Sequence, residues 1–141
     1  AGEGTWTCTT QPGGGGYGRL LVDCPDLRRA LLEQGMAHVF AMEGTPDPGD
    51  IQAQKTAIDQ GVGMWSKGAP SGLITSLHSM HERPGQAETY NRVADTVTGS
   101  ADRQTHSDTY ETCQEVCMGD SCMLYVPFEQ RYGDSRAACL R

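Results

Sequence analysis

The sequence predicts an α+β protein in two parts, a folded amino-terminal part and a disulfide-rich extension of strands and loops. In residues 1–66, runs of β-branched and aromatic residues precede two stretches with helical apolar spacing. From Ser66 onward the composition shifts to Ser, Thr, Gly and charged residues, and four of the six cysteines lie there. With 37% apolar residues in a chain of 141, one modest core is expected, and residues 67–141 should pack on it as a cysteine-tied extension.

The chain should begin with a β-hairpin. Residues 5–10 favour a strand because Thr and Trp suit a pleated surface. The loop follows at residues 12–16, which contain a proline and four glycines, and the returning strand is expected over residues 17–22. Folding the hairpin about its glycines places Cys8 opposite Cys24, which predicts a disulfide between the two strands.

Two helices with a short strand between them should follow the hairpin. Pro25 begins the first helix and Gly35 ends it, as these residues commonly do at the first and last positions. The apolar residues 36–42 predict a short strand. Asp50 is expected to cap the second helix, which should run to about Gln60.

The extension has weaker local signals. Apolar residues at helical spacing predict a short helix near residues 71–80. Beyond it we expect a strand over residues 90–97, a polar loop over 98–104, a second strand over 123–126, and a last helical turn or loop over 131–140.

Six cysteines in a short chain indicate an oxidising compartment, so a secreted, extracellular or periplasmic location is expected. Cys117 and Cys122 flank a Gly-Asp turn, and a local bond between them would leave Cys113 for Cys139. Four cysteines permit three pairings, so the other connectivities stay open. Six buried thiols, or a zinc site that includes His106, are the alternatives to disulfides.

The charge balance restricts the classes of function. Eleven basic against eighteen acidic side chains give a formal charge of −7, and the acidic excess is present in both parts of the chain. A broad basic footprint for nucleic acid is therefore absent, and phosphate chemistry would have to use a few placed cations. No apolar run reaches the roughly 20 residues of a membrane helix, so no membrane partner is expected.

Three motifs in order carry a family resemblance. Residues 17–19 read Y-G-R, residues 30–39 read A-L-L-E-Q-G-M-A-H-V, and residues 52–65 hold Q-A-Q-K-T-A followed by G-V-G-M-W. Residues 4–66 thereby resemble the carboxy-terminal half of the staphylococcal nuclease, or thermonuclease, family. The resemblance implies half of an OB-type β-barrel with two packed helices, in an enzyme that hydrolyses nucleic acid phosphodiester bonds with calcium. It also implies that Arg19 is the phosphate-binding catalytic arginine and that Tyr17 lies beside the bound nucleotide.

The sequence also departs from this family. In the family, the calcium carboxylates, the general-base glutamate and a second arginine lie on strands upstream of the Y-G-R, and this chain has no matching residues. The positions of two nucleotide-stacking tyrosines hold Ala41 and Glu43 here, and a lysine position holds Gly16. The resemblance therefore implies a partner that completes the sheet, either an upstream fragment of the same barrel or another chain, and calcium would bind only with that partner.

Several other acidic residues and histidines suggest sites that we interpret as structural. Residues 19–26 also resemble the family's metal-loop phrase, but they run directly into the helix that follows Y-G-R, so Asp23 and Asp26 are expected to be turn and helix-start residues. The group of His78, His81 and Glu82 has the wrong order for a metalloprotease, and His106 with Asp108 lies near a cysteine expected in a disulfide.

Two function classes result from the sequence. The first is a secreted calcium-dependent nuclease. This chain would contribute its phosphate-binding arginine, and the loop that holds the metal would come from the missing half. The alternative is a non-catalytic structural or interaction module, built on a nuclease-like scaffold with a disulfide-tied extension.

Overall fold

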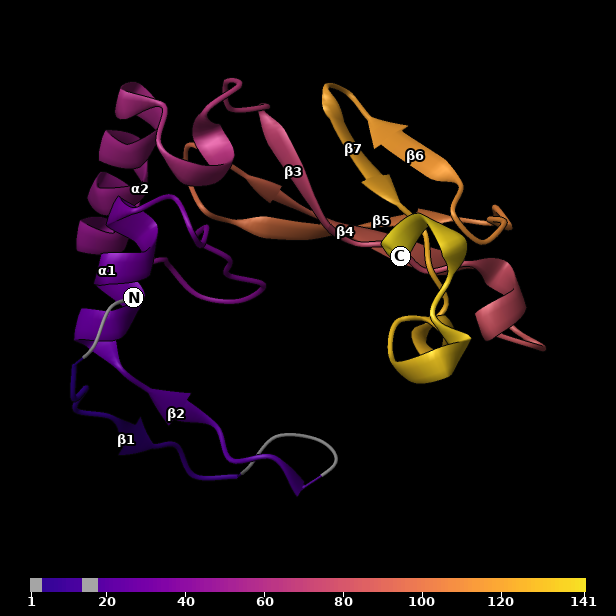
Figure 1. Cartoon of the computed structure of the whole chain (residues 1–141), viewed down its shortest axis with the longest axis horizontal. Helices are drawn as coiled ribbons and strands as arrows, with labels where there is room; N and C mark the ends of the chain where they lie inside the picture. Colours follow the sequence, from indigo (N-terminus) through magenta and orange to yellow (C-terminus); the bar gives the residue numbers. More distant parts are fainter. Residues whose placement is uncertain (1–3, 14–17) are drawn as a thin grey trace. The chain divides into compact units, whose positions relative to one another are not determined.

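The computed structural model describes residues 4–13 and 18–141 (Figure 1). The chain divides into two compact units: the first unit is Ala1–Val39 with Pro46–Ala69, and the second is Phe40–Thr45 with Pro70–Arg141. Two α-helices and several antiparallel sheets occur in the described residues, which confirms the α+β class, and no closed barrel forms among them. Within the same residues, no helix has the length and apolar character needed to cross a membrane.

The hairpin of the first unit has the predicted register. Strand β1 (Thr9–Thr10) pairs antiparallel with β2 (Val22–Asp23), with Thr9 opposite Asp23. One more step of the same register brings Cys8 opposite Cys24, and these cysteines form a disulfide with Cα atoms 4.2 Å apart. The strands are shorter than expected, because only two residues of each are paired within the described part of the hairpin.

Helices α1 (Pro25–Glu33) and α2 (Pro48–Gln60) follow and lie side by side in the first unit (Figure 1). Both have proline in the first turn, where its missing N–H costs nothing. The prediction that Asp50 caps α2 is wrong. The cap is Asp47, whose carboxylate accepts a hydrogen bond from the Asp50 backbone at 3.0 Å, because Pro48 begins the helix earlier than the apolar pattern indicated.

Gly35, after α1, and Gly63, after α2, approach each other closely in this unit. Gly35 follows α1 with φ +62°, and its carbonyl accepts a hydrogen bond from the Met64 N–H at 2.9 Å. Trp65 is 2% exposed and anchors the segment after α2.

The strand predicted over residues 36–42 is wrong. Only Ala41 forms a bridge, to Ser100, and the backbone N–H of Val39 donates to the Gln54 side chain at 2.6 Å instead of to a strand.

The second unit contains a three-stranded antiparallel sheet in the order β3-β4-β5, formed by β3 (Gly72–Ser76), β4 (Thr89–Asp95) and β5 (Ala101–His106). The predicted helix near residues 71–80 is therefore wrong. A register shift between Ile74 and Ser76 allows both Ile74 and Leu77 to enter the core, and this produces the three-residue spacing of a helix in a bulged strand.

The polar loop predicted over residues 98–104 is also wrong, since β5 occupies part of it. Asp95 organises the preceding turn by accepting hydrogen bonds from the backbone N–H groups of Val97 and Thr98, at 2.9 and 2.7 Å. β5 is an edge strand whose residues 102–105 are all exposed, so its sequence lacks the apolar alternation that marks a half-buried strand.

A second hairpin and the chain end complete this unit. Strands β6 (Glu115–Met118) and β7 (Ser121–Leu124) pair antiparallel, with Cys117 opposite Cys122 and bonded to it. The predicted strand 123–126 thus overlaps β7. Three single 3₁₀ turns follow, Phe128–Gln130, Gly133–Ser135 and Ala138–Leu140, and the Cys113–Cys139 disulfide ties the last of them down. The core beneath consists of Ile74, Leu77, Tyr110 and Tyr125.

Candidate functional site

Arg19, the predicted phosphate-binding residue, lies in the segment that leads into β2, and it is exposed. The next three residues are apolar and exposed as well: Leu20 is 77% exposed, Leu21 46% and Val22 55%. Tyr17, the predicted nucleotide neighbour, lies outside the described residues. The structure thus places a guanidinium next to an apolar run that the described part of the chain leaves open to solvent.

Ion pairs connect this hairpin to both helices. Arg28 pairs with Asp23 at the end of β2, and its Nε donates to Asp50 Oδ2 at 2.6 Å. Arg29 reaches the other Asp50 oxygen at 3.1 Å. The hydrogen bond to Asp50 is the largest cause of the raised pKa of Arg28. Asp23 and Asp50 therefore have structural partners. Asp26 lies in the first turn of α1, where its negative charge interacts favourably with the helix dipole and stabilises the helix.

The described residues do not fit a calcium site. Their only cluster of potential metal ligands is Glu115 with Cys117 and Cys122, and the two sulfur atoms form a disulfide rather than thiolates. Calcium requires six to eight oxygen ligands, which one glutamate does not supply. The zinc alternative is wrong for the same reason, because Cys113 is also in a disulfide. Any calcium carboxylates would have to come from elsewhere.

The histidines of the second unit take part in hydrogen bonds within the fold. Nδ1 of His78 lies 2.8 Å from the carbonyl oxygen of Tyr90, and Nδ1 of His81 lies 2.9 Å from Oγ of Ser79. Ser79 has no exposed surface, and its Oγ accepts a hydrogen bond from the Tyr110 N–H at 2.8 Å. A hydroxyl held in this way stabilises the fold and does not reach a substrate.

The other candidate pairs are likewise structural. The backbone N–H of Asp108 donates to Nδ1 of His106 at 3.1 Å, and the nearby Cys113 is oxidised, so no cysteine-histidine pair forms. The Tyr125 hydroxyl donates to Glu82 Oε1 at 2.8 Å. Burial, with that hydrogen bond, raises the pKa of Tyr125 well above its usual range and keeps the phenol neutral.

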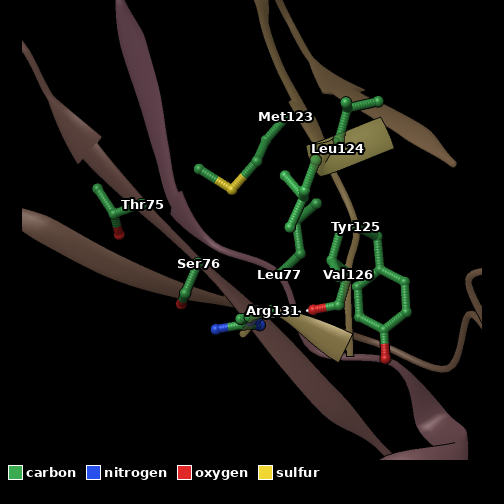
Figure 2. Close-up of a pocket in the computed structure, with 9 residues that line it drawn as sticks. Thr75, Ser76, Leu77, Met123, Leu124, Tyr125, Val126 and Arg131 are labelled. Atoms are coloured by element: carbon green, nitrogen blue, oxygen red, sulfur yellow. Dashed lines mark hydrogen bonds between the residues drawn. The ribbon is translucent and has the colours of Figure 1, made fainter. Parts of the chain in front are cut away.

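One pocket of about 230 Å³ opens in the second unit between residues of β3 and β7 (Figure 2). Most of its lining residues are apolar, Leu77 and Met123 among them, while Arg131 adds a guanidinium whose Nε donates to the Val126 carbonyl at 2.8 Å. Ser76 Oγ is buried there without a hydrogen-bond partner among the described residues. Sequence reasoning missed this pocket because it treated residues 71–80 as a helix.

No family model, curated protein or solved structure matches this chain.

His78 gives the second unit a predicted dependence on pH. Burial is the largest cause that lowers the pKa of His78 below its ordinary value, and the positive charge of Arg92 adds to it. Because the unfolded chain binds a proton more readily, stability is retained above about pH 6.5 and is lost as the pH falls through the lower folded pKa. Thermal unfolding from pH 7.5 to 5 should show this loss, and the slope should be smaller in His78→Gln. Identical slopes in the two proteins would contradict the assignment.

Proposed function

We propose that the first unit is the carboxy-terminal half of a secreted calcium-dependent nuclease that hydrolyses phosphodiester bonds. A further segment, either an upstream fragment of the same OB-type barrel or another chain, would pair with the hairpin and complete the sheet. The observation that carries this proposal is the exposed Arg19 directly before the exposed run Leu20–Val22. The Y-G-R resemblance gives the arginine its proposed role.

The hairpin has the properties of an incomplete sheet. Two paired residues in each strand make a ladder that is marginal by itself, and both strands have unpaired edges within the described residues. Covering apolar surface stabilises an assembly by roughly 25 cal/mol per Å². A strand laid along β2 would therefore gain backbone hydrogen bonds and bury Leu20 or Val22 at the same time.

This chain would contribute binding and electrostatics to the reaction. A guanidinium forks onto two phosphate oxygens and stabilises the charge that develops on a phosphoryl group. The aspartates Asp23 of β2 and Asp50 of α2 are committed to Arg28 and Arg29. Calcium-binding carboxylates and the general base would thus belong to the completing segment, and this chain alone should be inactive.

The test is to purify the chain with any polypeptide that accompanies it and to assay both forms on single-stranded DNA. The assembly should cleave in calcium and stop in chelator, and this chain alone should not cleave in either buffer. Absence of calcium-dependent cleavage by the intact assembly would contradict the nuclease proposal.

A non-catalytic structural or interaction module is the second candidate. Two observations favour it. The carboxylates of Asp23 and Asp50 are engaged by arginines, and the one ligand cluster found among the described residues holds its two sulfur atoms in a disulfide. An assembly that forms stably, buries Leu20 and Val22, and has no nuclease activity would support this candidate.

A further inference from the structure

Two arginines lie directly opposite each other on the sheet of the second unit. Arg92 of β4 is paired in register with Arg103 of β5, and paired residues share one face of an antiparallel sheet. Like charges in this position repel each other and destabilise the strand pair. In the part of the chain that the structure describes, no ion pair joins either guanidinium to a carboxylate. The fold thus keeps two neighbouring cations without neutralising them.

A tyrosine holds both guanidiniums near each other. The Tyr90 ring centroid lies 5.2 Å from the guanidinium carbon of Arg92 and 5.0 Å from that of Arg103. Arg92 also donates a hydrogen bond to the Tyr90 hydroxyl at 3.1 Å. Cation–π attraction to one ring therefore offsets part of the repulsion and orders the two side chains before any ligand arrives.

On β5 this face is exposed at Arg103 and Thr105, and on the opposite face of the sheet the buried Asn91 of β4 joins the core. Tyr90, which lies opposite Thr105, is half-buried. On the other face, the Asn91 side chain donates to the buried Tyr110 hydroxyl at 2.8 Å. We call the surface formed by Tyr90, Arg92, Arg103 and Thr105 the arginine-tyrosine face.

The local charge is positive although the chain as a whole carries −7. The pKa of His78, whose ring centroid lies 4.8 Å from that of Tyr90, is lowered by burial first and then by the charge of Arg92, while the carboxylate of Glu82 acts in the opposite direction. An anion would find two neighbouring cations here, Arg92 and Arg103, in a protein that otherwise repels polyanions.

We propose that the arginine-tyrosine face binds single-stranded nucleic acid, with a phosphate held between the guanidiniums of Arg92 and Arg103. The forked N–H groups of arginine match the geometry of phosphate oxygens, and the Thr105 hydroxyl adds a neutral hydrogen bond. Neighbouring bases would stack on the planar guanidinium groups that the Tyr90 ring supports, as on other platforms for single strands. The inference goes beyond the proposed nuclease, since it assigns a binding role to the second unit and needs neither calcium nor a completing segment.

An acidic peptide fits this face less well. Carboxylates would use the two positive charges, but they have no planar ring to lie against the guanidinium planes. A duplex is also less suitable, because its bases are stacked within the helix and a sheet face offers no element to enter a groove. Single strands use both the charge and the flat surface.

The experiment measures binding of a labelled oligothymidylate of about 12 nucleotides to this chain alone, by fluorescence anisotropy over a series of salt concentrations without calcium. Arg92→Gln with Arg103→Gln should weaken binding at least about tenfold and reduce the slope of log K against log salt by about 0.7, for the one phosphate held between them. Tyr90→Leu should weaken binding by about tenfold with an unchanged salt slope. Arg136→Gln with Arg141→Gln, which removes the same charge from the same unit, should leave affinity within about twofold.

The folding control is the melting temperature, which should not fall in Arg92→Gln with Arg103→Gln because that variant removes a repulsive pair. Equal oligonucleotide affinity in the wild type and this variant would overturn the proposal. Binding of poly-glutamate or of a duplex as tightly as the single strand would also overturn it, and would assign the face to an acidic protein or to double-stranded DNA. Because calcium and the completing segment are absent, these results are independent of the nuclease assay.

Discussion

Replacing Gly35 with Ala is expected to destabilise the first unit by about 3 kcal/mol or more. Gly35 has φ +62°, and a Cβ at this position would overlap the Val62 carbonyl oxygen and lie 2.9 Å from its carbon and 3.1 Å from Trp65 Cδ1. Most of these atoms are backbone, and Trp65 is packed in the core, so neither can move aside cheaply. The substitution should therefore separate the end of α1 from the segment after α2.

Gly61→Ala is the matched control. Gly61 has nearly the same backbone conformation, with φ +60°, but a Cβ there would meet only the Trp65 carbonyl oxygen, at 3.8 Å. Its cost should be about 1 kcal/mol, from the left-handed conformation alone. Both tryptophans, Trp6 and Trp65, belong to the first unit, so urea unfolding followed by tryptophan fluorescence reports on that unit. Equal losses in the two variants would show that the close approach at Gly35 contributes nothing.

The first unit could be predicted well where chemistry is local. The glycine loop set the hairpin register, which correctly aligned Cys8 with Cys24, and Pro25 and Gly35 bounded the first helix because each has a strong positional preference. The pairing of Cys117 with Cys122 followed from a turn, and it left Cys113 for Cys139 as the structure has them. Disulfide connectivity was thus accessible where loops are short.

The second unit was less predictable, because its sheet depends on contacts distant in sequence. The bulge after Ile74 imitates helical spacing, and β5 is so exposed that its residues resemble a loop. Reading β5 as a loop concealed the most informative pairing of the unit, that of Arg92 with Arg103. The sequence does show that Tyr90 and Arg92 would share one face of a strand, but only the register with β5 shows that Arg103 lies opposite Arg92.

The Arg19→Lys variant of the completed assembly should lose on the order of 10²-fold or more in turnover, by analogy with the loss of one transition-state donor. An ammonium group preserves the charge but not the two-pronged contact with phosphate. Stability should barely change, since Arg19 is exposed and its charge is retained. Initial rates on single-stranded DNA in calcium, with melting temperatures of both proteins, measure the two effects. Arg136→Lys, at another exposed arginine, is the control and should keep full activity.

The division of the loss between kcat and KM identifies what Arg19 does. A fall in kcat at nearly constant KM means that the guanidinium acts on charge that develops in the transition state, as a catalytic arginine should. A rise in KM alone means that it binds the ground state and transition state equally, which makes it a substrate-binding residue only. Full activity of Arg19→Lys would make Arg19 a surface cation, and the apolar run Leu20–Val22 would then remain as evidence of a docking strand without catalytic chemistry beside it.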